Sequence, residues 1–134
     1  KRIGNVAKML PEDWGDGYPN VWLLITVVNQ EEADRDISKL LSVPAALRGL
    51  SVEPQLGEIV LTEHEADLLD WVICGAESGP GRREFDIDWA RILRDQCKFA
   101  GTAFFLKQIP ADNRKGVIET PELDGRQWVE FPNV

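Results

Sequence analysis

The sequence is poor in the residues that most often bind metals or form disulfides. It contains 2 Cys, 1 Met and 1 His. Cys74 lies in an apolar run and Cys97 in an amphipathic stretch, and this isolated placement matches neither a zinc nor an iron–sulfur ligand pattern. His64 stands between two glutamates, so we expect a solvated surface side chain. These absences predict no metal site and two buried free thiols in a reducing compartment.

Long apolar runs and an excess of basic residues are also absent. No run approaches the roughly 20 residues that a membrane-spanning helix needs, so we expect no membrane contact. The first residues show neither an apolar signal core nor an initiator Met, from which we expect a cytoplasmic protein that is processed or cut from a longer chain. Lys and Arg number 15 against 23 Asp and Glu, a net charge of −8. A field of this sign repels phosphate backbones and attracts basic protein surfaces, although solubility alone also explains it.

What the sequence does contain is a repeated pattern of short apolar runs separated by amphipathic stretches. The runs predict buried strands at 21–28, 47–52, 72–74 and 102–106. Helical spacing predicts helices at 1–10, 31–41 and 89–100, and a short helix or turn at 62–69. Strands joined by helical crossovers are parallel. We therefore expect an α/β fold with a partial, half-barrel-like, mostly parallel four-stranded sheet. It forms a single domain over residues 1–134, with residues 110–134 as a carboxyl-terminal arm.

Polar side chains follow each predicted strand, and we expect them on one rim of the sheet, where such folds bind ligands. These candidate ligand-binding residues are Asn29, Gln30, Glu53, Glu77, Ser78, Lys107 and Gln108. Glu53 and Glu77 are candidates for a general acid and base or for gripping hydroxyl groups or an amine, with Lys107 neutralising them or holding an anion. In the alternative interpretation Glu53 caps a turn, while Glu77 and Lys107 form an ion pair. Residues 75–81 lack the Lys of a phosphate loop, and no triad His follows them, so we assign no catalytic residue.

Several segments together resemble a known family over nearly the whole chain. They are Asn20-Val-Trp-Leu23, Val28-Asn-Gln30, Pro44-Ala-Ala46, Leu50-Ser-Val-Glu-Pro54, Leu69-Asp-Trp-Val-Ile73, Gly75-Ala-Glu-Ser-Gly-Pro80, Leu93-Arg-Asp-Gln-Cys97, Phe104-Phe-Leu-Lys-Gln108 and Leu123-Asp-Gly-Arg126. The family comprises phage-associated proteins of unknown function (phage gp-thirty-seven/gp-sixty-eight type) with radical-SAM-like barrels. The chain resembles their carboxyl-terminal half and lacks the cysteine cluster of their amino-terminal half. Val28 stands where the family tends to have Glu, and Ala76 where it has a second Gly.

The resemblance and the charge together imply two alternative functions. In the first, the chain is a non-catalytic acidic phage or mobile-element protein without a cofactor. It occupies the basic surface of a host protein or nucleoprotein complex in the bacterial cytoplasm and inhibits it, as an anti-CRISPR protein does, without binding nucleic acid directly. In the second, the chain is half of an iron–sulfur enzyme, with S-adenosylmethionine and a cluster whose cysteines the full-length gene supplies. Half a barrel also leaves an open sheet edge, for the arm, a partner or a second copy in a homodimer to cover.

Overall fold

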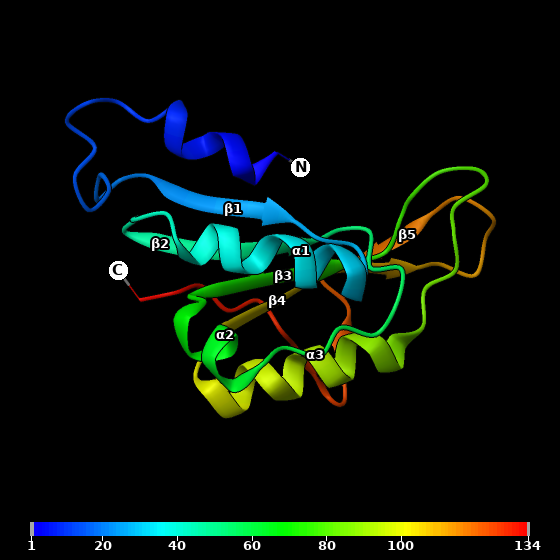
Figure 1. Ribbon diagram of the computed structural model, residues 1–134. Helices are drawn as coiled ribbons and strands as arrows, with labels where there is room; N and C mark the ends of the chain where they lie inside the picture. The colour runs from blue at the N-terminus through cyan, green and yellow to red at the C-terminus, as the bar shows by residue number, and fades with distance from the viewer. Residues whose placement is uncertain (1, 134) are drawn as a thin grey trace.

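A computed structural model describes residues 2–133 and contains one five-stranded sheet in the order β1-β2-β3-β4-β5 (Figure 1). The strands are β1 (Trp22–Thr26), β2 (Leu47–Val52), β3 (Trp71–Gly75), β4 (Ala103–Pro110) and β5 (Val117–Glu119). The first four strands are parallel, and β5 runs antiparallel to β4. The predicted α/β class with its mostly parallel sheet is confirmed. The sheet formed by residues 2–133 is open and does not close into a barrel.

The fifth strand is a difference from the prediction, which placed four strands and ended the last one before Pro110. Here β4 continues to Pro110, turns at 111–116 and returns as β5. Pro110 fits at this place because the missing N–H falls at the end of the ladder. Earlier in β4, the Leu106 N–H donates to the carbonyl of Trp128 at 2.8 Å, and the Glu130 N–H donates to that of Phe104 at 3.1 Å. The arm therefore covers the outer edge of β4.

The helices follow the predicted order, with one shortened element. They are η1 (Ile3–Lys8), α1 (Gln30–Leu41), α2 (Glu63–Leu68) and α3 (Ile87–Ala100). The helix predicted over 1–10 is only a 3-10 helix, η1. Asn29 caps α1 by accepting the Glu32 N–H at 2.9 Å, and Gly101 ends α3 at a positive φ of 80°. No helix within residues 2–133 is long and apolar enough to cross a membrane.

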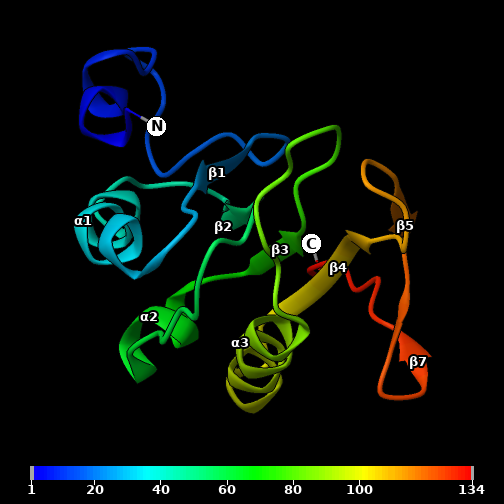
Figure 2. The ribbon, with the colours of Figure 1, turned by 90° about the vertical axis from the view of Figure 1, so that its right-hand side faces the viewer.

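Helices α1, α2 and α3 all lie on one side of the sheet (Figure 2). Alternate strand residues face them and form the core, which includes Ile25, Val27, Leu50, Val52, Val72, Cys74, Phe104 and Leu106. The residues between them face the opposite side, which we call the open face because no helix covers it. Two arm residues, Leu123 and Trp128, complete the core beside α3. A small hairpin formed by β6 (Glu122–Leu123) and β7 (Arg126–Gln127) positions them.

Candidate functional site

The polar centre of the open face is an ion pair between strands that are not neighbours. Lys107 in the middle of β4 contacts Glu53, just after β2, with 3.0 Å between Nζ and Oε2. The strand between them, β3, carries Gly75 at this level, so no side chain separates the two long ones. A register shift at Gly75 gives β4 an extra residue here, which is Lys107. The Ser51 hydroxyl donates to Glu53 at 3.3 Å and completes the group.

Glu77 does not join this pair. It follows β3 and binds Arg83 in the same loop, with 2.7 Å between Oε1 and the guanidinium, and also accepts the Arg83 backbone N–H at 2.8 Å. These hydrogen bonds lower the pKa of the Glu77 carboxyl to about 2, so it stays ionised at neutral pH. A group with this pKa is a poor general acid or base. The alternative pairing of Glu77 with Lys107 is wrong, because Glu77 pairs with Arg83 in its own loop and Lys107 pairs with Glu53.

Three of the other predicted rim residues, Asn29, Gln30 and Gln108, form hydrogen bonds that maintain the fold. Asn29 caps α1, and the Gln30 amide forms two hydrogen bonds with the backbone of Val60. Gln108 donates to the carbonyl of Ala76 at 2.7 Å. Ser78 is exposed in the loop after β3. Of the seven candidates, the structure brings only Glu53 and Lys107 together.

Between the ion pair and the amino ends of the strands, the open face carries an aromatic cluster that sequence reasoning did not predict. Its members are Trp22, Trp71, Phe105 and Phe131. The ring centroids of Trp22 and Trp71 are 5.7 Å apart in an edge-to-face arrangement, although β2 separates their strands. They meet because β2 presents Gly49, which has no side chain, beside Trp71. Strand alternation together with the strand register predicts the shared face of Trp22, Trp71 and Phe105, but the sequence alone does not give the register, and Phe131 lies outside the strands.

The buried thiols do not form a metal site. The Cys74 thiol donates to the buried Gln55 amide oxygen at 2.8 Å. Burial raises the pKa of Cys74, and it raises that of Cys97 to about 12, so both remain protonated. Residues 2–133 contain no group of three or more His, Cys, Asp or Glu side chains arranged to hold a metal ion. These residues therefore do not fit an iron–sulfur cluster by themselves.

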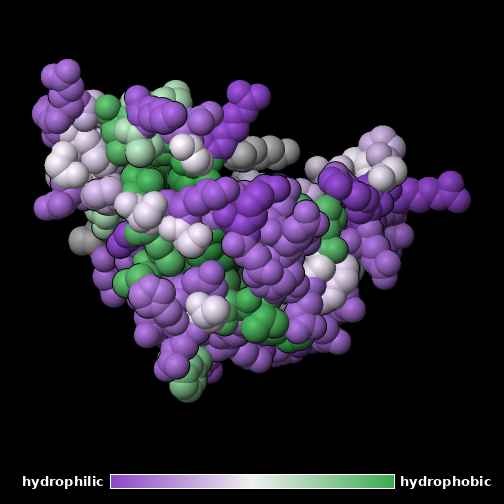
Figure 3. Space-filling view, viewed as in Figure 1, coloured by the Kyte–Doolittle hydropathy of each residue, from purple (hydrophilic) through white to green (hydrophobic). Residues whose placement is uncertain are grey.

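The helical side of the molecule carries a group of exposed acids, which we call the acidic helix face. Its residues are Glu31, Asp34, Glu58, Glu63 and Asp67. Hydrogen bonds between Gln30 and Val60 join the start of α1 to the segment that leads into α2, so Glu31, Asp34 and Glu58 lie near one another. Glu63 and Asp67 follow on α2, which lies by the other end of α1. None of the five has an ion-pair partner within residues 2–133, and the chain has no Lys or Arg between Arg48 and Arg82. Hydrophilic side chains cover α1 in the centre of Figure 3.

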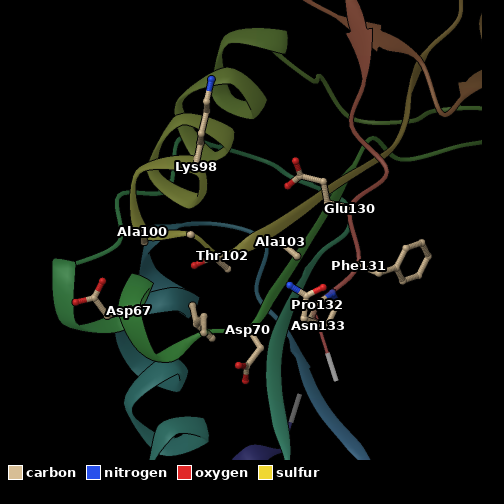
Figure 4. Close-up of a pocket in the computed structure, with 12 residues that line it drawn as sticks. Asp67, Asp70, Lys98, Ala100, Thr102, Ala103, Glu130, Phe131, Pro132 and Asn133 are labelled. Atoms are coloured by element: carbon tan, nitrogen blue, oxygen red, sulfur yellow. The ribbon is translucent and has the colours of Figure 1, made fainter.

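A hollow of about 560 Å³ extends this acidic surface toward the amino ends of the strands. Asp67 of α2, Asp70 just before β3, Lys98 of α3 and Glu130 of the arm line it (Figure 4). Because it borders residues that precede β3 and β4, it lies at the opposite end of the sheet from the Glu53–Lys107 pair. The hollow and the predicted rim site are therefore separate features.

Comparison with known proteins places the chain in a family. No match was found among curated proteins or solved structures. Residues 1–132 match the family described as "Protein of unknown function (DUF5131)". This span includes every strand, the Glu53–Lys107 pair and the acidic helix face. The chain belongs to this DUF5131 family.

Proposed function

We propose that this protein is a non-catalytic acidic binding protein that engages the basic surface of a partner and inhibits it. The acidic helix face is the observation that carries the proposal. Negative charges on one surface strengthen the local negative potential. This potential speeds association with a positively charged surface and repels nucleic acid. The partner class is therefore a protein that uses a basic surface to bind nucleic acid. The phage-associated resemblance makes a host defence complex our specific proposal, in the manner of an anti-CRISPR protein.

The state of the rim residues supports a role without catalysis. Glu53 is held by Lys107, and the Glu77 carboxyl is held ionised by Arg83. A general acid–base pair needs one group that gains and loses a proton near the working pH. The Glu77 pKa of about 2 is far from that range.

Affinity capture with paired charge variants tests the proposal. The test variant carries Glu31→Gln, Glu58→Gln, Glu63→Gln and Asp67→Asn, all exposed positions on the acidic helix face. The control removes the same charge elsewhere on the surface through Glu12→Gln, Asp16→Asn, Glu84→Gln and Glu122→Gln. We expect the wild type and the control, but not the test variant, to retain a basic nucleic-acid-binding protein from a bacterial lysate, and heparin to release it. Equal retention by both variants would contradict the proposal.

A second candidate function is the substrate-side half of an iron–sulfur radical-SAM-like enzyme. The favouring observation is the sequential order of four parallel strands with one face uncovered, because a β/α barrel has this order and turns that face inward. In that arrangement the Glu53–Lys107 pair would line the interior. Anaerobic iron and sulfide analysis of the full-length gene product, with calorimetric titration of S-adenosylmethionine, tests it. Iron with cofactor binding would favour this candidate, and a colourless product that does not bind the cofactor would exclude it.

A further inference from the structure

The outer edge of β1 presents unpaired backbone groups. The Val27 N–H donates to the carbonyl of Ser51, which fixes the odd-numbered residues of β1 as those bonded to β2. The N–H and C=O groups of Trp22, Leu24 and Thr26 therefore point away from the sheet. Within residues 2–133 these groups have no backbone partner. The opposite edge of the sheet is different, because β5 and the arm cover β4.

Strand β1 itself lacks the charges, prolines and bulges that usually protect an exposed edge, and η1 is the element that lies beside it. Edge strands are commonly blocked by charged side chains, prolines or bulges, because an open ladder recruits another strand. Residues 21–28 contain neither a charge nor a proline, and the pairing of β1 with β2 is regular. The edge of β1 is therefore suited to strand addition.

A cleft of about 400 Å³ runs along this edge between β1 and η1. Ile3 and Val6 of η1 line one side together with Met9, which follows η1, and Leu23 to Ile25 line the other. In Figures 1 and 2, η1 lies beyond β1, where the sheet would otherwise continue. Figure 3 shows apolar side chains around η1 and the start of β1 at the upper left. A strand edge facing a helix across an apolar cleft is the arrangement in which peptides add to a sheet, with backbone hydrogen bonds for affinity and side-chain pockets for specificity.

The charge at this cleft is opposite to that of the whole protein. Arg2 lines the cleft and Lys8 lies in the last turn of η1, both exposed and without an ion-pair partner in the described part of the chain. Residues 2–11 contain no acid, although the net charge of the protein is −8. An acidic group on an incoming segment would meet its complement here.

We infer that the β1 edge binds an extended peptide segment of a partner protein, with alternating apolar side chains and a flanking acidic residue. The segment adds to the sheet as a new edge strand beside β1. Its backbone pairs with Trp22, Leu24 and Thr26, one apolar side chain enters the cleft, and its acidic residue faces Arg2. This site is separate from the acidic helix face and does not depend on the function proposed above.

Fluorescence anisotropy with the labelled peptide acetyl-Glu-Val-Thr-Val-Glu-Val-amide tests the inference. A second peptide carries N-methyl groups on alternate amides, and a third has Lys in place of both Glu residues. We expect the first peptide to bind, and N-methylation to weaken binding about tenfold or more because the backbone hydrogen bonds are lost. The lysine peptide should bind several-fold more weakly to the wild type, and Arg2→Glu should reverse that preference.

A protein variant provides the matched control. Thr26→Pro removes an N–H that points outward, so the bonds between β1 and β2 remain and only strand addition is blocked. We expect Thr26→Pro to abolish peptide binding while its melting temperature stays near that of the wild type. The N-methylated peptide serves as the readout should this variant not fold. Absence of binding at millimolar peptide, binding insensitive to N-methylation, or a stable wild-type dimer that Thr26→Pro dissociates would overturn the inference.

Discussion

Replacing Gly49 with Ala should destabilise the sheet, although Ala is usually the better residue inside a strand. A Cβ atom at this position would lie 2.6 Å from the Trp71 carbonyl oxygen and 3.3 Å from the Leu24 Cγ. The first neighbour is backbone of the adjacent strand, so β2 and β3 must separate to admit the methyl group. The contact between Trp22 and Trp71 passes over the same residue and would be disturbed as well.

The expected cost follows from three terms. Overpacking a well-packed site costs about 1–3 kcal/mol. Loss of an aromatic pair adds about 0.5–1.5 kcal/mol. The smaller backbone entropy of Ala in the unfolded chain stabilises the folded protein by about 0.4–1 kcal/mol. We expect a net loss of about 2 kcal/mol in the free energy of unfolding, which corresponds to a melting temperature lower by about 8 °C for a domain of this size.

Thermal unfolding followed by circular dichroism measures this loss, with Gly57→Ala as the control. Gly57 has an ordinary φ, and nothing lies within 4 Å of the position that a Cβ atom would take, so Ala there should be neutral or stabilising by up to about 1 kcal/mol. The near-ultraviolet spectrum should also change in Gly49→Ala, because the two tryptophan rings move relative to each other. A Gly49→Ala protein as stable as Gly57→Ala, with an unchanged near-ultraviolet spectrum, would refute the reasoning.

Three further changes test other contacts. The folded pKa of Glu77 is about 2 against an ordinary 4.5, so its stabilising contribution is complete above pH 4.5 and is lost as the pH falls toward 2. Acid titrations should show less loss of stability over this window in Glu77→Gln, and identical curves would contradict the Arg83 pairing. Lys107→Met should change the free energy of unfolding by less than about 1 kcal/mol in urea denaturation, because the Lys107 side chain is 55% exposed; a larger loss would mean that the pair holds β2 and β4 together. Trp128→Ala should cost about 3–5 kcal/mol in the same assay, because Trp128 is buried against Phe104, and a loss under 1 kcal/mol would show that the arm does not complete the core.

Local signals in the sequence predicted most of the sheet. The run at 47–52 matches β2 at both ends, and Asn29 caps α1 as its residue type and position indicate. The strand β5 was not predicted because it has only three residues, two of them exposed, and forms by pairing with the edge of β4. Its existence depends on a long-range contact rather than on its own composition.

The candidate site was less predictable, for a related reason. Placement of Glu53 and Lys107 on one rim followed from the parallel topology. Their pairing depends on Gly75 and on a register shift in β4, which no local pattern encodes. The partner of Glu77 is Arg83 in the same loop, a contact set by the loop's conformation rather than by the sheet.

The most direct test of the proposed function is competition with nucleic acid. The partner retained in the capture experiment would be loaded with its labelled nucleic acid and titrated with this protein in a gel mobility assay. We predict that the wild type displaces the nucleic acid. The Glu31→Gln, Glu58→Gln, Glu63→Gln, Asp67→Asn variant should need at least about tenfold more protein, and added salt should weaken the wild-type effect. Nucleic acid that stays bound at every concentration, or equal displacement by both proteins, would contradict inhibition through the acidic helix face.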